Sequence, residues 1–184
     1  MEPPGIREND AALDKAAEDV LGMLCTEFMQ KTGSHVETII AAAACLAGLS
    51  VLRSRGFDLR PYAPGTLLAY DPGGELEGIQ DFLTAEAGRA GLDPSGGWDG
   101  EIPDVHLPKF SVPELTRETE TKFYSVCDRH RLGRVHVPHA AGLAALKFVH
   151  AADRVRLLDQ NTGKALIRSY LAAGAKTVPS VPFA

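Results

Sequence analysis

Cysteine is scarce in this chain. There are only three, Cys25, Cys45 and Cys127, and they lie far apart in the sequence. An odd number at such distances is not the pattern of a disulfide framework. Cys25 and Cys45 fall in apolar stretches with helical periodicity, where a free thiol behaves as a small hydrophobic side chain. The cysteine content therefore favours reduced thiols and a reducing compartment.

Secretion and membrane signals are also missing. The first residues, Met1 to Gly5, contain neither the basic nor the apolar region of a signal peptide. The longest uncharged apolar run, Ile39 to Leu52, is fourteen residues long, and a helix needs about 18–20 to cross a bilayer. We therefore expect a cytoplasmic protein that is not inserted in a membrane.

A strongly basic region, as is typical of nucleic-acid-binding domains, is absent. The net charge is -5, with seven Lys or Arg against fourteen Asp or Glu in residues 1–92 and twelve against ten in residues 93–184. We therefore expect no nucleic-acid partner. Basic residues are concentrated between positions 129 and 156, which favours a small anion or an acidic partner near Arg129, Arg131 and Arg134. A solvated helix face is the alternative explanation.

The most apolar stretch of the chain predicts a buried central helix over Val36–Leu52. It follows Ser34-His35-Val36-Glu37, a capping-box pattern in which Ser34 and Glu37 satisfy each other's amides. An acid stands in the first turn, and Arg53 and Arg55 follow at the end, as the helix dipole favours. A helix that is apolar on all sides and too short for a membrane belongs in the centre of a bundle.

Apolar residues recur at intervals of three and four in five further stretches, and this predicts a mainly α, single-domain bundle of about six helices around the alanine-rich central one. Two stretches rich in Pro and Gly, 57–74 and 91–109, are expected to be long loops. The first contains a short strand candidate, Thr66–Tyr70. The domain covers 1–184, with extended or flexible tails at 1–8 and 177–184. The helices are expected at about 10–31, 36–52, 76–90, 111–133, 138–153 and 162–173.

Two alanine-rich helices begin alike. His35-Val36 precedes the central helix, and His136-Val137 precedes the segment from Ala140 to Ala145. The similarity allows two related halves packed about a pseudo-twofold axis. Two shared residues and a shared composition are weak support, so we favour coincidence.

The closest set of metal-ligating residue types is Cys127, His130, His136 and His139. Zinc takes thiolate and imidazole ligands in a tetrahedron, and pairs spaced by two residues can supply two ligands from one turn. The junction of the fourth and fifth helices is therefore a candidate zinc site. The alternative is that these residues serve core packing and the surface separately, since the spacing matches no zinc motif.

Other chemistry-bearing residues show no specific motif. His35, Glu37 and the group Asp99, Glu101, Asp104 and His106 are available for acid–base chemistry, but sequence alone does not show that they converge. The stretch from Asp159 to Lys164 has its glycine one position early for a calcium loop, so Asp159 or Asn161 is expected to cap a helix instead.

These observations favour a non-catalytic helical binding or self-association domain. The first two helices carry more apolar surface than one neighbour covers, and twofold dimers are the commonest way to bury such surface. We therefore expect a homodimer. The alternative function is a metal-dependent enzyme with zinc bound at the junction of the fourth and fifth helices.

Overall fold

The computed structural model describes residues 5–33 and 35–180. These residues form an all-helical bundle, as predicted, with the helices α1 (Gly5–Thr32), α2 (Val36–Ser54), α3 (Gly73–Arg89), α4 (Val112–Arg129), α5 (Val137–Arg154) and α6 (Gln160–Ala175), and the short 3-10 helix η1 (Asp104–His106). The strand candidate Thr66–Tyr70 does not form a strand. It contributes only an isolated antiparallel bridge between Leu67 and Thr177.

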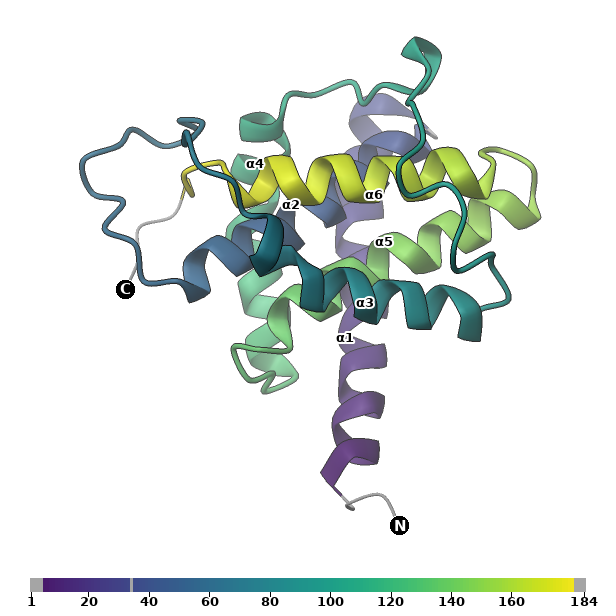
Figure 1. Cartoon of the computed structure of the whole chain (residues 1–184), viewed down its shortest axis with the longest axis horizontal. Coiled ribbons are helices and arrows are strands. Elements are labelled where there is room, and N and C mark those ends of the chain that lie inside the picture. The colour runs from purple at the N-terminus through teal and green to yellow at the C-terminus, as the bar shows by residue number, and fades with distance from the viewer. Residues whose placement is uncertain (1–4, 34, 181–184) are drawn as a thin grey trace.

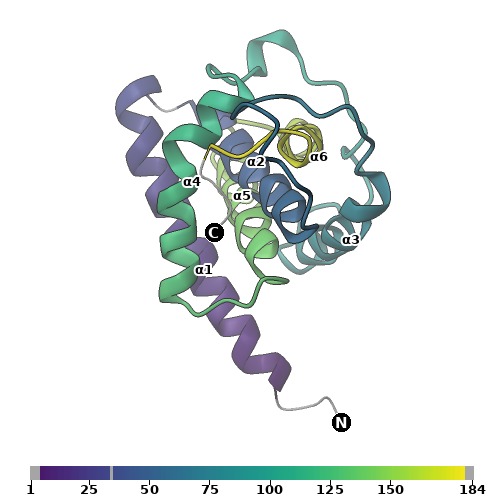
Figure 2. The ribbon, with the colours of Figure 1, turned by 90° about the vertical axis from the view of Figure 1, so that its left-hand side faces the viewer.

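The helices are arranged in three layers of two (Figures 1 and 2). α2 and α5 form the middle layer, α1 and α4 lie on one side of it, and α3 and α6 lie on the other. Each layer therefore takes one helix from α1–α3 and one from α4–α6. His35 and His136 stand at the N-caps of the two middle helices.

α2 is the core of the molecule. It has nineteen residues, of which all but Arg53 and Ser54 are buried. Among the helices described, it alone is long and apolar enough to cross a membrane, yet 94% of the qualifying window is buried inside the bundle. The sequence argument that this helix is too short to cross a membrane is therefore wrong. Its burial inside the bundle is nevertheless that of a core helix.

α1 begins earlier than its periodicity predicts. The expected start was near Asp10 with a tail over 1–8, but the helix includes residues from Gly5 onward, and residues 1–4 lie outside the described part. α1 has 28 residues and α4, beside it in the same layer, has 18. The additional N-terminal turns extend beyond the other helices in both views (Figures 1 and 2).

Two helix caps position the second half of the bundle. At α4, the Ser111 amide donates to Glu114 Oε2 at 2.8 Å as part of a capping box. At α6, Asp159 rather than Asn161 is the cap, and its Oδ1 accepts from the amides of Asn161 and Thr162. The capping box predicted at Ser34 lies outside the described residues.

The second Pro/Gly loop is folded onto α6. Lys164 is fully buried, and its Nζ donates to the Asp93 carbonyl at 2.7 Å. Gly97 has φ +84°, and an added Cβ there would meet Asn161 Cα at 2.6 Å, so only glycine lets the loop approach α6 so closely. Trp98 packs against the core and donates from Nε1 to the Pro94 carbonyl.

Candidate binding groove and neighbouring polar site

The proposed zinc ligands do not come together. Cys127 lies in the core, and burial raises the pKa of its thiol to about 12, so it is not a thiolate at neutral pH. His130 sits at the end of α4, where its Nε2 lies 2.9 Å from Asp19 Oδ2. Within residues 5–33 and 35–180, no group of three or more His, Cys, Asp or Glu side chains is placed to hold a metal ion.

His136 and His139 stand at the start of α5, with their ring centroids 6.2 Å apart. His139 Nδ1 donates to the Val135 carbonyl, and its ring packs edge-on against Phe82. Burial lowers the pKa of His139, which favours the neutral ring. These contacts assign His139 to the α3–α5 packing.

The three arginines of the predicted anion surface also differ in their surroundings. Arg129 Nη2 lies 3.7 Å from Asp19 Oδ2, so its charge is partly compensated. Arg131 and Arg134 are exposed in the turn between α4 and α5.

An apolar groove lies instead between the C-terminal halves of α1 and α5. We call it the α1–α5 groove; its volume is about 210 Å³, and it is lined by Cys25, Met29, Val36, Ile39, Phe148, Ala151, Ala152, Val155 and Leu157. Met29, Val155 and Leu157 are 49%, 64% and 59% exposed. Apolar side chains that gather around one hollow mark a site for an apolar partner more clearly than the same residues scattered.

The exposure of Leu157 is unusual for its position. α3, α4 and α5 all end in the same Schellman motif, in which the amides of Leu92, Leu132 and Leu157 donate to the carbonyls of Ala87, Cys127 and Ala152. Leu92 is buried in the core and Leu132 packs against it. Leu157 alone of the three is exposed, at the edge of the groove.

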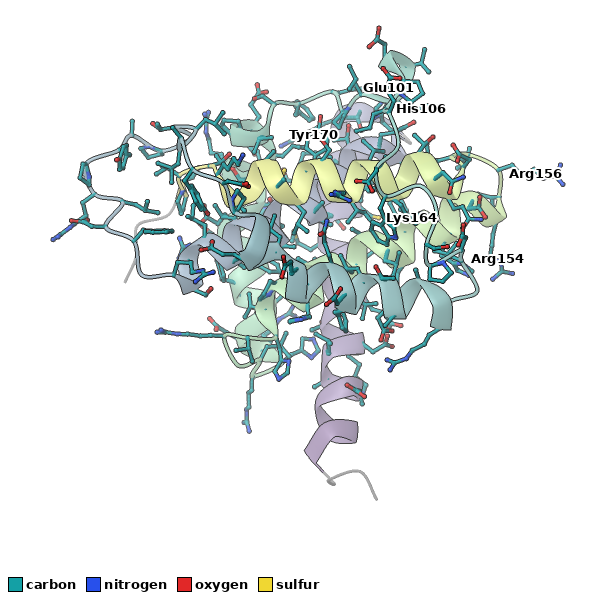
Figure 3. The ribbon with its side chains drawn as sticks, viewed as in Figure 1. Glu101, His106, Arg154, Arg156, Lys164 and Tyr170 are labelled. Atoms are coloured by element: carbon teal, nitrogen blue, oxygen red, sulfur yellow. The ribbon has the colours of Figure 1, made fainter. Side chains whose placement is uncertain are left out.

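Two cations accompany these apolar residues. Arg154 and Arg156 flank Val155 in the sequence, and both are exposed. Their side chains project from the end of α5 into solvent (Figure 3). Neither guanidinium forms a salt bridge with any side chain in the part of the chain that the structure describes. This end of the molecule thus combines an apolar hollow with two uncompensated positive charges.

A polar cluster lies next to the groove, at the start of α2. Glu37 is almost fully buried; its Oε1 lies 2.7 Å from His106 Nδ1 and its Oε2 lies 3.5 Å from His35 Nδ1. The hydroxyl of Thr38 accepts from the Lys109 amide. His106 comes from η1, in the loop that passes above α6 (Figure 3). The structure therefore brings together three residues that the sequence offered for acid–base chemistry.

In this cluster, Glu37 fixes the orientation of the His106 imidazole ring. If His106 Nδ1 donates to Glu37, the other ring nitrogen is left as an acceptor. His106 lines a shallow hollow with Asp153, Arg156 and Asp159. Asp159 caps α6, and Asp153 accepts from the Gln160 amide. Asp153 and Asp159 thus hold the start of α6 in place. The Glu37–His106 cluster anchors the loop 104–109 on α2.

A second hollow, of about 630 Å³, lies at the opposite end of α2. It is lined by the segment from Gly56 to Pro64 and by Val178, Pro179 and Ser180. Phe57 and Tyr62 are exposed there. In the described residues it contains no charged side chain other than Asp58 and Arg60, which pair with each other.

Comparison with known proteins adds no family assignment. No protein-family model matches the chain, and no match is found among curated proteins or solved structures. The function is therefore inferred from the groove and its neighbours. Sequence reasoning did not find the groove, because its residues come from helices far apart in the chain and each has an ordinary core-like spacing.

Proposed function

We propose that this chain is a binding domain whose α1–α5 groove receives an apolar helical segment with acidic flanking residues. The observation that carries the proposal is the combination of exposed Met29, Val155 and Leu157 with two unpaired arginines. The apolar side chains supply the contact area. Arg154 and Arg156 favour a negatively charged partner and disfavour a positive one.

Two matched synthetic helices test this function. Both carry leucines at intervals of three and four, and the remaining positions are glutamate in one peptide and lysine in the other. By fluorescence anisotropy, we expect the glutamate peptide to bind at least about tenfold more tightly, which corresponds to about 1.4 kcal/mol. The double variant Arg154→Glu, Arg156→Glu should reverse this preference, because the apolar contacts remain while the charge changes sign.

Leu157→Asp should remove binding of both peptides, because it places a charge in the apolar hollow. The matched control is Val105→Asp, which alters a residue that is 78% exposed on η1, outside the groove. The proposal is wrong if neither peptide binds at about 1 mM protein, or if Leu157→Asp and Val105→Asp bind equally well.

The enzyme alternative has lost its proposed metal site but keeps one supporting observation, the Glu37–His106 pair. The Thr38 hydroxyl in the same cluster lies 2.9 Å from His35 Nδ1 and accepts from the Lys109 amide, so these contacts also anchor the loop on α2. We therefore place binding first. Metal analysis of protein purified without an affinity tag separates this alternative, since about one bound zinc per chain would favour a metal enzyme.

A further inference from the structure

The residues that follow α6 are bonded to the first Pro/Gly loop through their backbones. We call residues 176–180 the strap; they lie beside the loop that follows α2 (Figure 1). The Val178 amide donates to the Thr66 carbonyl at 2.9 Å, and the Gly65 amide donates to the Val178 carbonyl at 2.9 Å. Backbone bonds of this kind provide affinity for an extended segment, whereas pockets for its side chains provide specificity.

Two contacts give the strap its place on the bundle. Val178 is buried against Leu52 and Leu59 in a small apolar cluster that is separate from the main core. Two residues further on, the Ser180 amide donates at 2.8 Å to Oε2 of Glu120, which is fully buried. The surface under the strap therefore has a pocket for one small apolar side chain and a carboxylate for one backbone amide.

The strap is attached to the bundle by few apolar contacts. Part of it lines the hollow of about 630 Å³, together with the exposed side chains of Phe57 and Tyr62. Segments with few buried apolar contacts open locally at a free energy below that of global unfolding. When the strap opens, Glu120 keeps its ion pair with Arg53, whose Nη2 lies 2.7 Å from Oε1. We therefore expect the strap to leave its place while the bundle stays folded.

We propose that the surface under the strap is a binding site for an extended peptide, which the chain's own strap occupies in this structure. An open strap leaves backbone donors and acceptors of residues 65–68 unpaired, and an extended segment of another molecule can pair with them. The peptide places a valine-sized side chain between Leu52 and Leu59. Its backbone amide two residues later donates to Glu120.

The strap regulates this site by competition. Because it belongs to the same chain, its effective concentration at the site is high, on the order of millimolar for a short flexible connection. A free peptide therefore binds only to the fraction of molecules in which the strap is open. The site lies at the opposite end of α2 from the α1–α5 groove, so this inference does not depend on the proposed function.

Release of the strap tests the site. Val178→Asp should open the strap, because it places a charge in the apolar cluster. The probe is a fluorescently labelled peptide with the sequence of residues 175–184, and its binding is measured by anisotropy. It should bind Val178→Asp protein at least about tenfold more tightly than wild type, in which the strap competes. Val105→Asp, at a residue that is 78% exposed on η1, is the matched control and should bind like wild type.

Two further controls separate the site from unspecific binding and from misfolding. The same peptide carrying Val178→Asp should not bind, because its charge cannot enter the apolar cluster. Ser180→Pro protein provides a milder release, since proline lacks the amide that donates to Glu120. It should bind the unchanged peptide severalfold more tightly than wild type, and it keeps the test decisive if Val178→Asp protein does not fold.

A disulfide that holds the strap closed provides the reciprocal test. Leu67 and Thr177 form an antiparallel pair in which the flanking residues exchange the backbone bonds. Such pairs have Cα atoms about 4.5 Å apart, within the roughly 4.4–6.8 Å that a disulfide allows. In the Ser180→Pro background, Leu67→Cys with Thr177→Cys should therefore lose peptide binding on oxidation and regain it on reduction.

These measurements have distinct outcomes. The peptide site is overturned if neither Val178→Asp nor Ser180→Pro protein binds the peptide at about 1 mM protein. It is also overturned if the oxidised and reduced cysteine variants bind equally well, because the peptide then binds elsewhere. Either result leaves the proposed function of the α1–α5 groove standing, since the glutamate and lysine peptides test that groove separately.

Discussion

Two arginines occupy backbone conformations that usually belong to glycine. Arg131 and Arg156 have φ of 53° and 58°, at the same position of the Schellman motif where α3 has Gly91, with φ 80°. The left-handed region costs a side-chain-bearing residue about 1 kcal/mol or more relative to glycine. The turns after α4 and α5 therefore retain strain that the turn after α3 avoids.

We expect Arg131→Gly to raise the free energy of unfolding by about 0.5–1 kcal/mol, because relief of this strain exceeds the added flexibility of the unfolded chain. Urea denaturation measures it, with Gly91→Ala as the reciprocal control, which should lower the free energy of unfolding by a similar amount. A destabilised Arg131→Gly would mean that contacts of the arginine outweigh its backbone strain. Arg131 lies outside the groove, so this test does not disturb the proposed binding surface.

The histidines show that spacing in the sequence does not predict which side chains a residue contacts. Cys127 and His130 are three positions apart, which predicted a common side of α4. At the end of the helix, however, Cys127 faces the core, and His130, as the C-cap residue, pairs with Asp19 of α1. A partner from a distant helix decides the role of His130. Conversely, Glu37 and His106 are sixty-nine positions apart and meet only because the loop after Gly91 returns across α2.

At the scale of the element, α2 and α6 touch through their backbones. A Cβ added at Gly48 of α2 would lie 2.0 Å from the Leu171 carbonyl oxygen, and one added at Gly174 of α6 would lie 2.2 Å from that of Cys45. These glycines occupy reciprocal positions at one crossing. The alanines of α2 continue the same narrow surface, so the composition that predicted a buried helix also sets how closely its neighbour packs.

Gly48→Ala and Gly174→Ala should therefore each lower the free energy of unfolding by about 1–3 kcal/mol or more, since backbone atoms cannot yield as a flexible side chain does. Thermal or urea unfolding measures the change. Gly78→Ala is the matched control, because nothing lies within 4 Å of its added Cβ on α3. It should be neutral or stabilising by up to about 1 kcal/mol. Equal effects at positions 48 and 78 would contradict the close α2–α6 contact.

Helices were predictable from sequence because each carries its own signals. Six apolar periodicities and the Asp159 cap predicted the elements of the bundle, with boundaries a few residues off. The first helix was placed too short because its initial turns have no apolar stripe to mark them. The predicted strand had too few pairing partners, since only Leu67 bridges to the C-terminal segment.

At the scale of the whole molecule, the surplus apolar surface is smaller than the sequence suggests. The first two helices were expected to leave apolar surface for a partner, but α2 is covered by α1, α4, α5 and α6. What stays open is the α1–α5 groove. Its position depends on how three layers assemble, and no local pattern contains that information. The homodimer thus stays a prediction.

Salt provides the last test of how the whole molecule binds its partner. Exposed ion pairs weaken as the Debye length shortens, from about 10 Å at 0.1 M salt to about 3 Å at 1 M. Apolar contacts do not weaken in this way. If Arg154 and Arg156 contact the glutamate peptide, its dissociation constant should rise about tenfold between these concentrations, as fluorescence anisotropy would measure. The double variant Arg154→Gln, Arg156→Gln should bind this peptide more weakly at low salt and respond little to added salt. A wild-type dissociation constant that is the same at both concentrations would show that charge plays no part in the binding.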